Sequence, residues 1–528
     1  MAALFITLFL PLLGAIILLF FNKDNVKAIK SSTLFISILT FAASLPLFFS
    51  FNQQDPGFQF VFEMSWIPAF DAGFRIGLDG MSLLLVMLTT FITPIAIMSS
   101  FESIKKRHKS YYIMILLLQF GMTGVFVSLD IFLFYIFWEL ILIPMYFIIG
   151  IWGGKDKIYA AVKFFLFTVV GSLFMLVAIV WLGSYTGSTI LGLESGFTTN
   201  FMVIREVSNQ IPMDIQKWLF GAFALSFLIK VPIFPLHTWL PDAHTEAPTP
   251  GSVILAGVLL KMGTYGLVRF NVDLFPNASI EYAPFISTLA VIGIVYGALV
   301  ALVQTDVKRL VAYSSVSHLG FVVLGIFSLT AEGIQGAVIQ MVNHGLSTGM
   351  LFLLVGMLYE RRHTRSISEY GGIARVMPNY AVFFGIAMFA SVGLPSLNGF
   401  VGEYLTLLGA FKSPFLNSWW YTIIGTTGVI FAAAYLLWMY QRVFFGTNDN
   451  PKNHHLQDVT AFEKAMLIPI VIFIVWIGIY PSTFLKVSEN STRALINKVE
   501  NTRGRTPYVL PQLEENTDSE ETDNSINK

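Results

Sequence analysis

The 528-residue chain contains no cysteine, and only 12% of its residues are charged. Without cysteine it can form neither disulfides nor cysteine-ligated iron–sulfur clusters. A soluble domain carries about 25% charged residues, so the low charge argues against a soluble protein. The formal net charge is zero. This argues against nucleic acid as a partner, because a surface that binds phosphates must be basic.

Motifs that would indicate a bound cofactor are missing as well. No metal-ligand spacing, P-loop or dinucleotide fingerprint occurs in a fitting context. We therefore expect this chain to bind no cofactor and no metal.

Long hydrophobic runs make up most of the chain, and 55% of its residues are hydrophobic. A helix needs about 20 apolar residues to cross the hydrocarbon core of a bilayer. By that measure we predict an all-α integral membrane protein with about 14 transmembrane helices. The predicted spans are residues 2–21, 31–51, 79–101, 111–129, 131–150, 159–184, 216–238, 250–271, 284–304, 309–329, 334–359, 379–411, 418–445 and 463–482. The polar tail, 485–528, ends in an acidic run and is expected to be disordered.

Lysine and arginine are distributed unevenly between the loops. The loops after odd-numbered spans carry about 17 of them and the loops after even-numbered spans about 4, which places the odd loops in the cytoplasm. Both termini are then expected on the outer, periplasmic side. The extended polar tail favours a bacterial plasma (inner) membrane over an organellar one.

Ionisable residues lie inside several predicted spans. On the insertion scale each charge costs about 2.5–3.5 kcal/mol, so each needs a reason to be there. Each of them lies within about 10 Å of the midplane, at 1.5 Å of rise per residue. A series of acids, lysines and imidazoles at similar depth favours a lateral proton relay. The relay candidates are Glu139, Lys230, Lys261, His318, His344 and Glu403.

Two of the predicted spans are interrupted. The span 216–238 contains Pro232 and Pro235, and the span 379–411 contains Gly393-Leu394-Pro395. Proline removes a backbone donor, and the freed groups must then be satisfied by protein or by water in a cavity. The two broken spans are five apart, which favours an inverted repeat of two five-helix blocks, spans 4–8 and 9–13.

We expect these blocks to define the domains. Residues 1–110 would hold the first three spans, 111–271 the first repeat and 272–445 the second repeat. Span 14 would occupy 446–484, ahead of the tail.

Each of these signals has a structural alternative. Pro232 and Pro235 can simply kink a helix. Glu139 and Lys230 can form a purely structural buried pair, and a lone histidine at 318 or 344 can be a hydrogen-bonded packing residue.

Three further residues are auxiliary candidates for the same relay: Lys163, His237 and His244. Lys163 can instead snorkel to the membrane interface. Both histidines can be solvated at the cytoplasmic end of the seventh span.

Three motifs resemble the antiporter-like subunits of respiratory complex I. They are the run Lys230–His244 (KVPIFPLHTWLPDAH), continued by TEAPTPGSVILAG, the run Gln304–Gly320 (QTDVKRLVAYSSVSHLG), and Asn343–Gly345. Related cores occur in multisubunit cation/proton antiporters and in membrane-bound hydrogenase complexes. Glu403 discriminates among them, because the M-type (chain 4) subunit has glutamate there and its relatives usually have lysine. About 14 spans also suit the M-type subunit.

This resemblance implies a proton-translocating subunit of NADH:quinone oxidoreductase that has no redox centre of its own. Glu139 would tune Lys230, Lys261 would link the two halves with the help of the histidines, and Glu403 would pass protons outward. NADH, FMN, iron–sulfur clusters and quinone would bind to partner subunits. The expected partners are L-type and N-type antiporter-like subunits, small membrane subunits and the lipid bilayer.

Two other functions remain open at this point. A cation/proton antiporter subunit, or a membrane-bound hydrogenase subunit, would have a related core but a different energy source. A membrane scaffold would use the same charges only for structure. Dependence of transport on sodium would favour the antiporter, and normal pumping without Glu139 and Lys230 would favour the scaffold.

Overall fold

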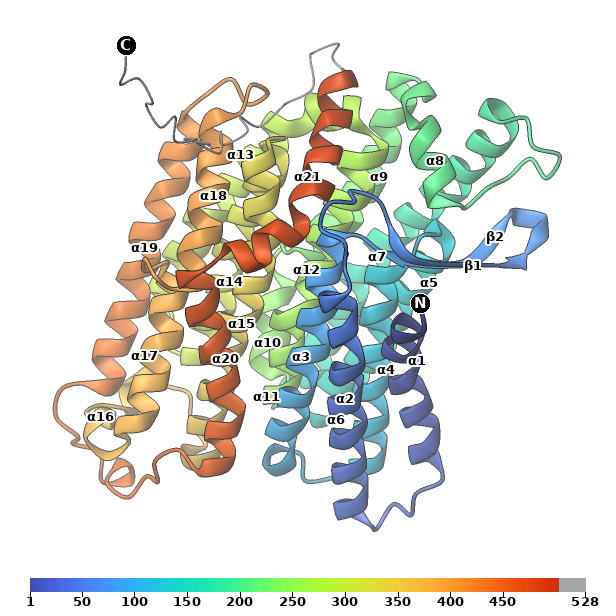
Figure 1. Ribbon diagram of the computed structural model, residues 1–528. Helices are drawn as coiled ribbons and strands as arrows, with labels where there is room; N and C mark the ends of the chain where they lie inside the picture. The colour runs from blue at the N-terminus through green and yellow to red at the C-terminus, as the bar shows by residue number, and fades with distance from the viewer. Residues whose placement is uncertain (503–528) are drawn as a thin grey trace, which may run out of the picture.

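The structure is a computed structural model that describes residues 1–502. Long helices run side by side through most of the molecule (Figure 1). In the first part of the chain the helices are α1 (Ala2–Leu19), α2 (Val26–Phe49), α3 (Gly80–Ser103), α4 (His108–Val127), α5 (Ile131–Leu140), α6 (Leu142–Trp152), α7 (Lys157–Ser184), α8 (Phe201–Val207), α9 (Met213–Lys230), α10 (Trp239–Glu246), α11 (Thr249–Ile254) and α12 (Leu260–Gly266). They are followed by α13 (Pro276–Leu302), α14 (Val307–Phe327), α15 (Ala331–Arg362), α16 (Ile373–Val376), α17 (Pro378–Val392), α18 (Asn398–Lys412), α19 (Trp420–Phe444), α20 (Ala461–Ile479) and α21 (Ser482–Thr502).

Within residues 1–502, 12 helical segments are long and apolar enough to cross a membrane. A predominantly helical membrane architecture is therefore confirmed, whereas the count of 14 spans stays a prediction. The two predicted spans that are not among the 12 are 216–238 and 379–411. Both are broken into shorter pieces, as their proline and glycine residues indicated.

The first break follows Lys230, the last residue of α9. The helix stops short of residue 238, where the interrupted span was predicted to end, because Pro232 has no N–H to continue the helical hydrogen bonds. A second helix, α10, then forms where the sequence indicated a loop. The indole of Trp239 in α10 donates a hydrogen bond of 2.8 Å to the carbonyl of Ile229, which partly satisfies the broken end.

The second break separates α17 from α18. Gly393 ends α17 with a φ of +82°, a left-handed conformation that favours glycine. The side chain of Asn343, in α15, donates a 2.7 Å hydrogen bond to the carbonyl of Asn398 at the start of α18. This bond ties α15 to the start of α18, while at the broken end of α17 the N–H of Leu394 donates a 3.1 Å hydrogen bond to the carbonyl of Phe389.

The centre of the bundle is formed by α14, α15 and the segment Thr249–Val272, which are almost completely buried. That segment contains two π-helical stretches, η4 (Leu255–Leu259) and η5 (Leu267–Val272), on either side of α12. π-Helical turns in α-helices are rare and occur frequently at functional sites. Lys261 lies in α12, between the two stretches.

The hydrophilic connection 52–78 contains a β-hairpin that the sequence did not indicate. Strand β1 (Gln59–Ile67) pairs antiparallel with β2 (Ala72–Leu78), and the hairpin projects from one side of the bundle (Figure 1). Arg75 fixes it, because its guanidinium forms ion pairs of 2.5–2.9 Å with Glu63, Asp71 and Asp130. Glu63 and Asp71 belong to the same hairpin, whereas Asp130 is 55 residues away in sequence and is brought to Arg75 only by the fold.

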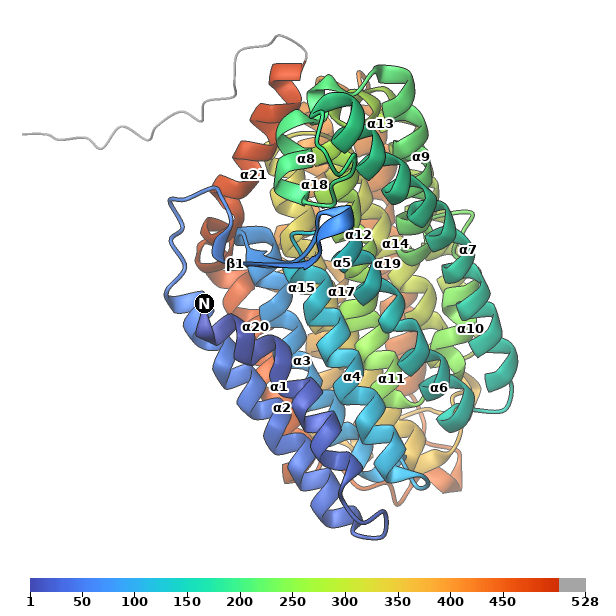
Figure 2. The same ribbon diagram turned by 90° about the vertical axis from the view of Figure 1, so that its right-hand side faces the viewer.

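The C-terminal region differs from the prediction. Residues 485–502 were expected to be disordered, but they belong to α21 (Figures 1 and 2). Apolar residues recur there at helical spacing and form one buried face, a pattern that overall polarity concealed. The buried apolar residues of this face are Phe484, Val487, Leu495, Ile496 and Val499. Residues 503–528, the rest of the predicted tail, lie outside the described residues.

Helix α21 crosses the molecule and is anchored at both ends. Near its start, Gln335 of α15 donates a 3.1 Å hydrogen bond to the carbonyl of Leu485. Near its end, the ammonium of Lys498 contacts the carboxylate of Asp273 at 3.1 Å and its carbonyl at 2.6 Å. Asp273 also pairs with Arg205 at 2.8 Å. Lys498 also donates a 2.9 Å hydrogen bond to the carbonyl of Arg205, so α21 contacts both parts of the chain that the sequence assigned to separate repeats.

Burial raises the pKa of Asp273, but the positive charges of Lys498 and Arg205 outweigh it and hold this pKa below its usual value. The ion pairs therefore contribute stability above the ordinary aspartate pKa and lose it as the pH falls through the lowered value. We expect Lys498→Met to loosen the end of α21 by about 1–3 kcal/mol, because a buried acceptor loses a partner. Hydrogen–deuterium exchange of residues 482–502 measures this.

The control is Lys486→Met, which removes an exposed lysine from the same helix. Its exchange should match that of the wild type. Equal exchange in both variants and the wild type would show that Lys498 does not anchor the helix.

Candidate functional site

Four of the predicted relay residues meet in the middle of the bundle. Lys261 comes from α12, His318 from α14, His344 from α15 and Glu403 from α18. All four side chains are at most 4% exposed. Four separate helices thus bring a lysine, two imidazoles and a carboxylate into one buried row.

Lys261 and His344 are in direct contact. The ammonium of Lys261 lies 2.6 Å from Nδ1 of His344 and also hydrogen-bonds to the carbonyl of Ala256 in η4. The other ring nitrogen of His344, Nε2, has no hydrogen-bond partner. The imidazole can therefore accept on one side and remains free on the other.

His318 connects this pair to Glu403. Its Nδ1 lies 3.2 Å from Oε1 of Glu403, and its ring centre lies 6.0 Å from that of His344. Nε2 of His318 contacts the hydroxyl of Tyr435 at 3.4 Å, and Gln340 donates to Glu403 at 3.4 Å. The carboxylate is thus held by two side chains in a position buried from solvent.

Glu139 and Lys230 form a separate group. The side chain of Lys230 is fully buried, and its ammonium has no hydrogen-bond partner. Glu139 is near enough to interact with it electrostatically, but the two do not form an ion pair. Oε1 of Glu139 is likewise buried and unpartnered. The static ion pair offered as the structural alternative is therefore not what the structure shows.

Helix α12 packs tightly against the broken end of α9. A Cβ atom at Gly263 would lie 2.8 Å from the carbonyl of Phe227 and 3.0 Å from Cβ of Lys230. Glycine therefore permits this approach, and it brings the helix that carries Lys261 next to Lys230. The packing of α12 on α9 therefore joins the Lys230 group to the central row.

The three auxiliary candidates occupy different settings. Lys163 forms a 2.7 Å ion pair with Asp242 of α10. His237 is 3% exposed and His244 is fully buried, so the interpretation that they are solvated is wrong. His244 stacks on Phe352 with ring centres 4.4 Å apart, and neither of its ring nitrogens has a hydrogen-bond partner.

Sequence reasoning missed several residues that surround the relay. Gln340 lies one helical turn before His344, so the spacing of four residues could have indicated it. Tyr435 offered no such signal, because a tyrosine inside a hydrophobic run is ordinary. Trp138 and Phe164 were missed for the same reason, although both lie beside the ammonium of Lys230.

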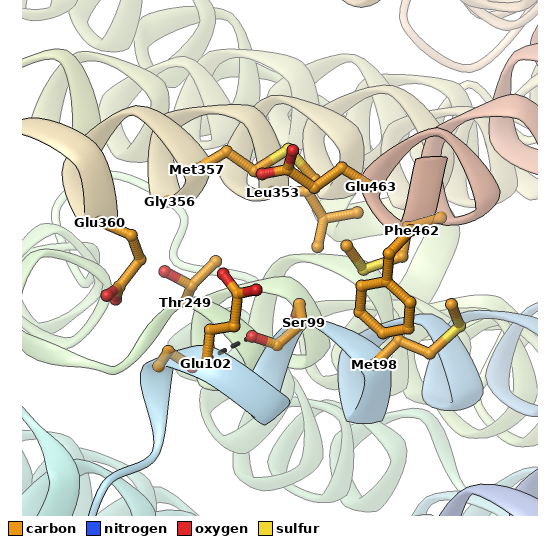
Figure 3. Close-up of a pocket in the computed structure, with 12 residues that line it drawn as sticks. Met98, Ser99, Glu102, Thr249, Leu353, Gly356, Met357, Glu360, Phe462 and Glu463 are labelled. Atoms are coloured by element: carbon orange, nitrogen blue, oxygen red, sulfur yellow. Dashed lines mark hydrogen bonds between the residues drawn. The ribbon is translucent and has the colours of Figure 1, made fainter. Parts of the chain in front are cut away.

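Two neighbouring clefts open at the end of the bundle that carries the basic loops. The smaller has a volume of about 30 Å³, and Figure 3 shows Glu102, Glu360 and Glu463 around it. The larger, of about 160 Å³, is lined by Glu246 and Lys308 among others and shares Glu360 with the first. It also includes Thr245, the residue that follows the buried His244. The larger cleft is thus lined by the residue that follows a buried imidazole in the sequence.

No group of three or more metal-ligating side chains occurs within residues 1–502. The carboxylate, amine and imidazole groups of the buried row support proton transfer. Each of these can gain or lose a proton without a covalent change.

Comparison with known proteins agrees with this chemistry. A sequence profile described as NADH:quinone oxidoreductase/Mrp antiporter matches residues 128–432, and one for the amino terminus of NADH-ubiquinone oxidoreductase chain 4 matches residues 5–123. A relative from Rickettsia prowazekii, NADH-quinone oxidoreductase subunit M, is 44% identical over 93% of this chain and 98% of its own length. The chain belongs to the M-subunit (chain 4) family of NADH:quinone oxidoreductases. The family expected from the sequence is thereby confirmed.

Other relatives and solved structures support the same family. NADH-ubiquinone oxidoreductase chain 4 of Marchantia polymorpha is 43% identical over 92% of this chain and 95% of its own length. A chain of respiratory complex I from Thermus thermophilus is 31% identical with a TM-score of 0.82, covering 94% of this chain and 99% of that one. A chain of the Mrp complex from a Dietzia species has a TM-score of 0.81, with 95% and 99% coverage. At 18% identity it shows only a shared fold.

Gly393 lies against the carboxylate of Glu403, so a substitution there tests the position of that carboxylate. A Cβ atom there would lie 2.5 Å from Oε2 of Glu403, and the φ of +82° costs a non-glycine residue about 1–2 kcal/mol. We expect Gly393→Ala to displace the Glu403 carboxylate and to lower proton pumping at least severalfold in an assembled complex. NADH-driven proton uptake by inverted vesicles measures this effect.

Gly385→Ala is the matched control in the same helix, because the added Cβ would approach only the Tyr440 hydroxyl, at 3.4 Å. It should pump like the wild type. Normal pumping by Gly393→Ala would mean that the exact position of the Glu403 carboxylate is unimportant.

Proposed function

We propose that this chain carries protons across the membrane as the M-type subunit of a NADH:quinone oxidoreductase. The proposed relay consists of Glu139, Lys230, Lys261, His344, His318 and Glu403. The observation that carries the proposal is the buried row from Lys261 through the two histidines to Glu403. Such a row costs folding free energy, which a purely structural core would avoid by using apolar residues.

Proton transfer along the row needs only short steps. Lys261 can give a proton to Nδ1 of His344 over the 2.6 Å that separate them. The two imidazoles are 6.0 Å apart between ring centres, a gap that one water or a ring rotation bridges. His318 can then pass a proton to Glu403 over 3.2 Å. The histidines are suited to this role because imidazole both accepts and donates near neutral pH.

In the first half, Glu139 would control whether Lys230 holds its proton. Burial disfavours a charged lysine, and a nearby carboxylate favours it. When Glu139 approaches, the ammonium is stabilised, and when it withdraws, the proton is released toward Lys261. The missing ion pair and the unpartnered Glu139 oxygen describe the withdrawn arrangement.

The energy for pumping must come from partner subunits. A chain without cysteine cannot ligate a cysteine-bound iron–sulfur cluster, and we assign NADH, FMN, iron–sulfur clusters and quinone to the partners. L-type and N-type antiporter-like subunits and small membrane subunits would adjoin this chain in the bilayer. Charge movement in a neighbour would then change the balance between Glu139 and Lys230.

The two broken helices support the proposed inverted repeats, 111–271 and 272–445. Residues 1–110 and 446–484 would add the flanking spans on either side. We place the end with the basic loops in the cytoplasm and both termini on the periplasmic side of a bacterial inner membrane. The clefts at the basic end would then give protons access from the cytoplasm.

The test of the proposal is Glu403→Gln in the assembled complex. An amide cannot take up a proton from His318, so NADH-driven proton uptake by inverted vesicles should fall by roughly two orders of magnitude. Glu332→Gln is the control, because Glu332 pairs with Lys412 at a partly exposed position away from the relay. It should pump normally.

Subunit composition on a native gel shows that each variant has assembled. Normal pumping by assembled Glu403→Gln would remove this residue from the relay. Sodium-dependent transport would then favour an antiporter. A Lys230→Ala variant that assembles and pumps normally would favour a scaffold.

A further inference from the structure

The ammonium of Lys230 lies between aromatic rings. It is 5.2 Å from the ring centre of Trp138, in α5, and 5.5 Å from that of Phe164, in α7. Both distances are within the roughly 6 Å over which a cation is attracted to an aromatic face. The amine has no hydrogen-bond partner, and the two ring faces lie within range of a cation–π contact.

The local sequence explains why the rings and the carboxylate are separate partners. Trp138 and Glu139 are consecutive residues of α5, and consecutive helical side chains point about 100° apart. Trp138 is 1% exposed and faces the core, whereas Glu139 is only partly buried. The helix therefore presents an aromatic face to Lys230 permanently, and the carboxylate must move to engage it.

The two rings are themselves firmly held. Trp138 packs against Phe227 with ring centres 5.3 Å apart, and Phe164 packs against Trp239 at 5.4 Å. Phe164 and Trp239 are fully buried. Trp239 also donates the hydrogen bond to the broken end of α9. The cage is thus built into the packing around the helix break.

Lys261 makes a useful comparison. This second buried lysine has a ring nitrogen and a backbone carbonyl as its partners and no aromatic face over its amine. Direct acceptors suit a lysine that hands its proton to a histidine. Aromatic rings stabilise an ammonium but cannot themselves accept its proton.

We propose that Trp138 and Phe164 form an aromatic cage that stabilises the protonated side chain of Lys230 and so sets how readily its proton leaves once Glu139 withdraws. This inference rests on the proposed function, because it assigns Lys230 a proton that moves. The ring faces attract the ammonium through their quadrupole and have no comparable attraction for the neutral amine. Trp138 is therefore a positioning residue that helps Lys230 keep its proton until Glu139 withdraws.

The other charged groups around Lys230 are already engaged or are named above. From α5 it faces Glu139. On α7, Lys163 is paired with Asp242 of α10, and on α12, Lys261 is bound to His344. The effect of removing a ring should therefore appear on the protonation of Lys230 itself.

The experiment compares the pH dependence of NADH-driven proton uptake by inverted vesicles that contain the whole complex. Losing a ring face makes the ammonium less stable, so uptake should fall at a lower pH on the alkaline side. For Trp138→Leu we expect the half-maximal point to shift by about one pH unit, the equivalent of one desolvated cation–π contact. Trp138→Phe keeps a weaker ring face and should shift less, and Phe164→Leu should also shift the profile.

Phe134→Leu is the matched control. Phe134 is buried on the same helix and packs against Trp138 at 5.6 Å, but it makes no cation–π contact with Lys230. Its pH profile should match that of the wild type. Equal shifts in Phe134→Leu and Trp138→Leu would assign the effect to packing and overturn the cage.

An unshifted profile for Trp138→Leu would also overturn the proposal. If that variant does not assemble, Trp138→Phe and Phe164→Leu decide it, and unshifted profiles for both would reject the cage. Lys230→Ala separates this inference from the proposed function. Abolished pumping in Lys230→Ala beside an unshifted Trp138→Leu leaves the relay intact and removes only the cage, whereas normal pumping in Lys230→Ala rejects the relay itself.

Discussion

The rest of this structure depends on one constraint, that backbone groups inside a bilayer need partners within the protein. Two helices break in the bundle, and each break frees carbonyl and N–H groups. At the first break the indole of Trp239 supplies a partner, and at the second the N–H of Leu394 donates to the carbonyl of Phe389. Both breaks therefore find hydrogen-bond partners within the protein.

The positions of the buried charges follow from these breaks. Lys230 is the last residue of α9, and Glu403 lies in α18, just after the second break. Gly263 and Gly393 permit close approaches at the two places, one to Lys230 and one to Glu403. Between them, Lys261, His344 and His318 form the buried row. A packed core with fixed distances turns isolated titratable groups into neighbours that can exchange protons.

The two buried lysines illustrate how surroundings assign different tasks to the same residue type. Lys261 contacts a histidine that can accept its proton, whereas Lys230 lies beside aromatic rings that cannot. Helix α21 contacts both halves, because Lys498 donates hydrogen bonds to the carbonyls of Arg205 and Asp273. Local partners thus set the chemistry at each lysine.

The sequence by itself determined the membrane class, the positions of the two broken helices, the buried ionisable residues and the family. These properties depend on composition, on proline and glycine, and on local motifs, all of which are read along the chain. Only the tertiary structure decided which of those residues touch, that His237 and His244 are buried, and that Trp138 faces Lys230. It also revealed the hairpin around Arg75 and the helix at residues 482–502. Such features depend on contacts between segments that are distant in sequence, and no local pattern encodes a distance between two helices.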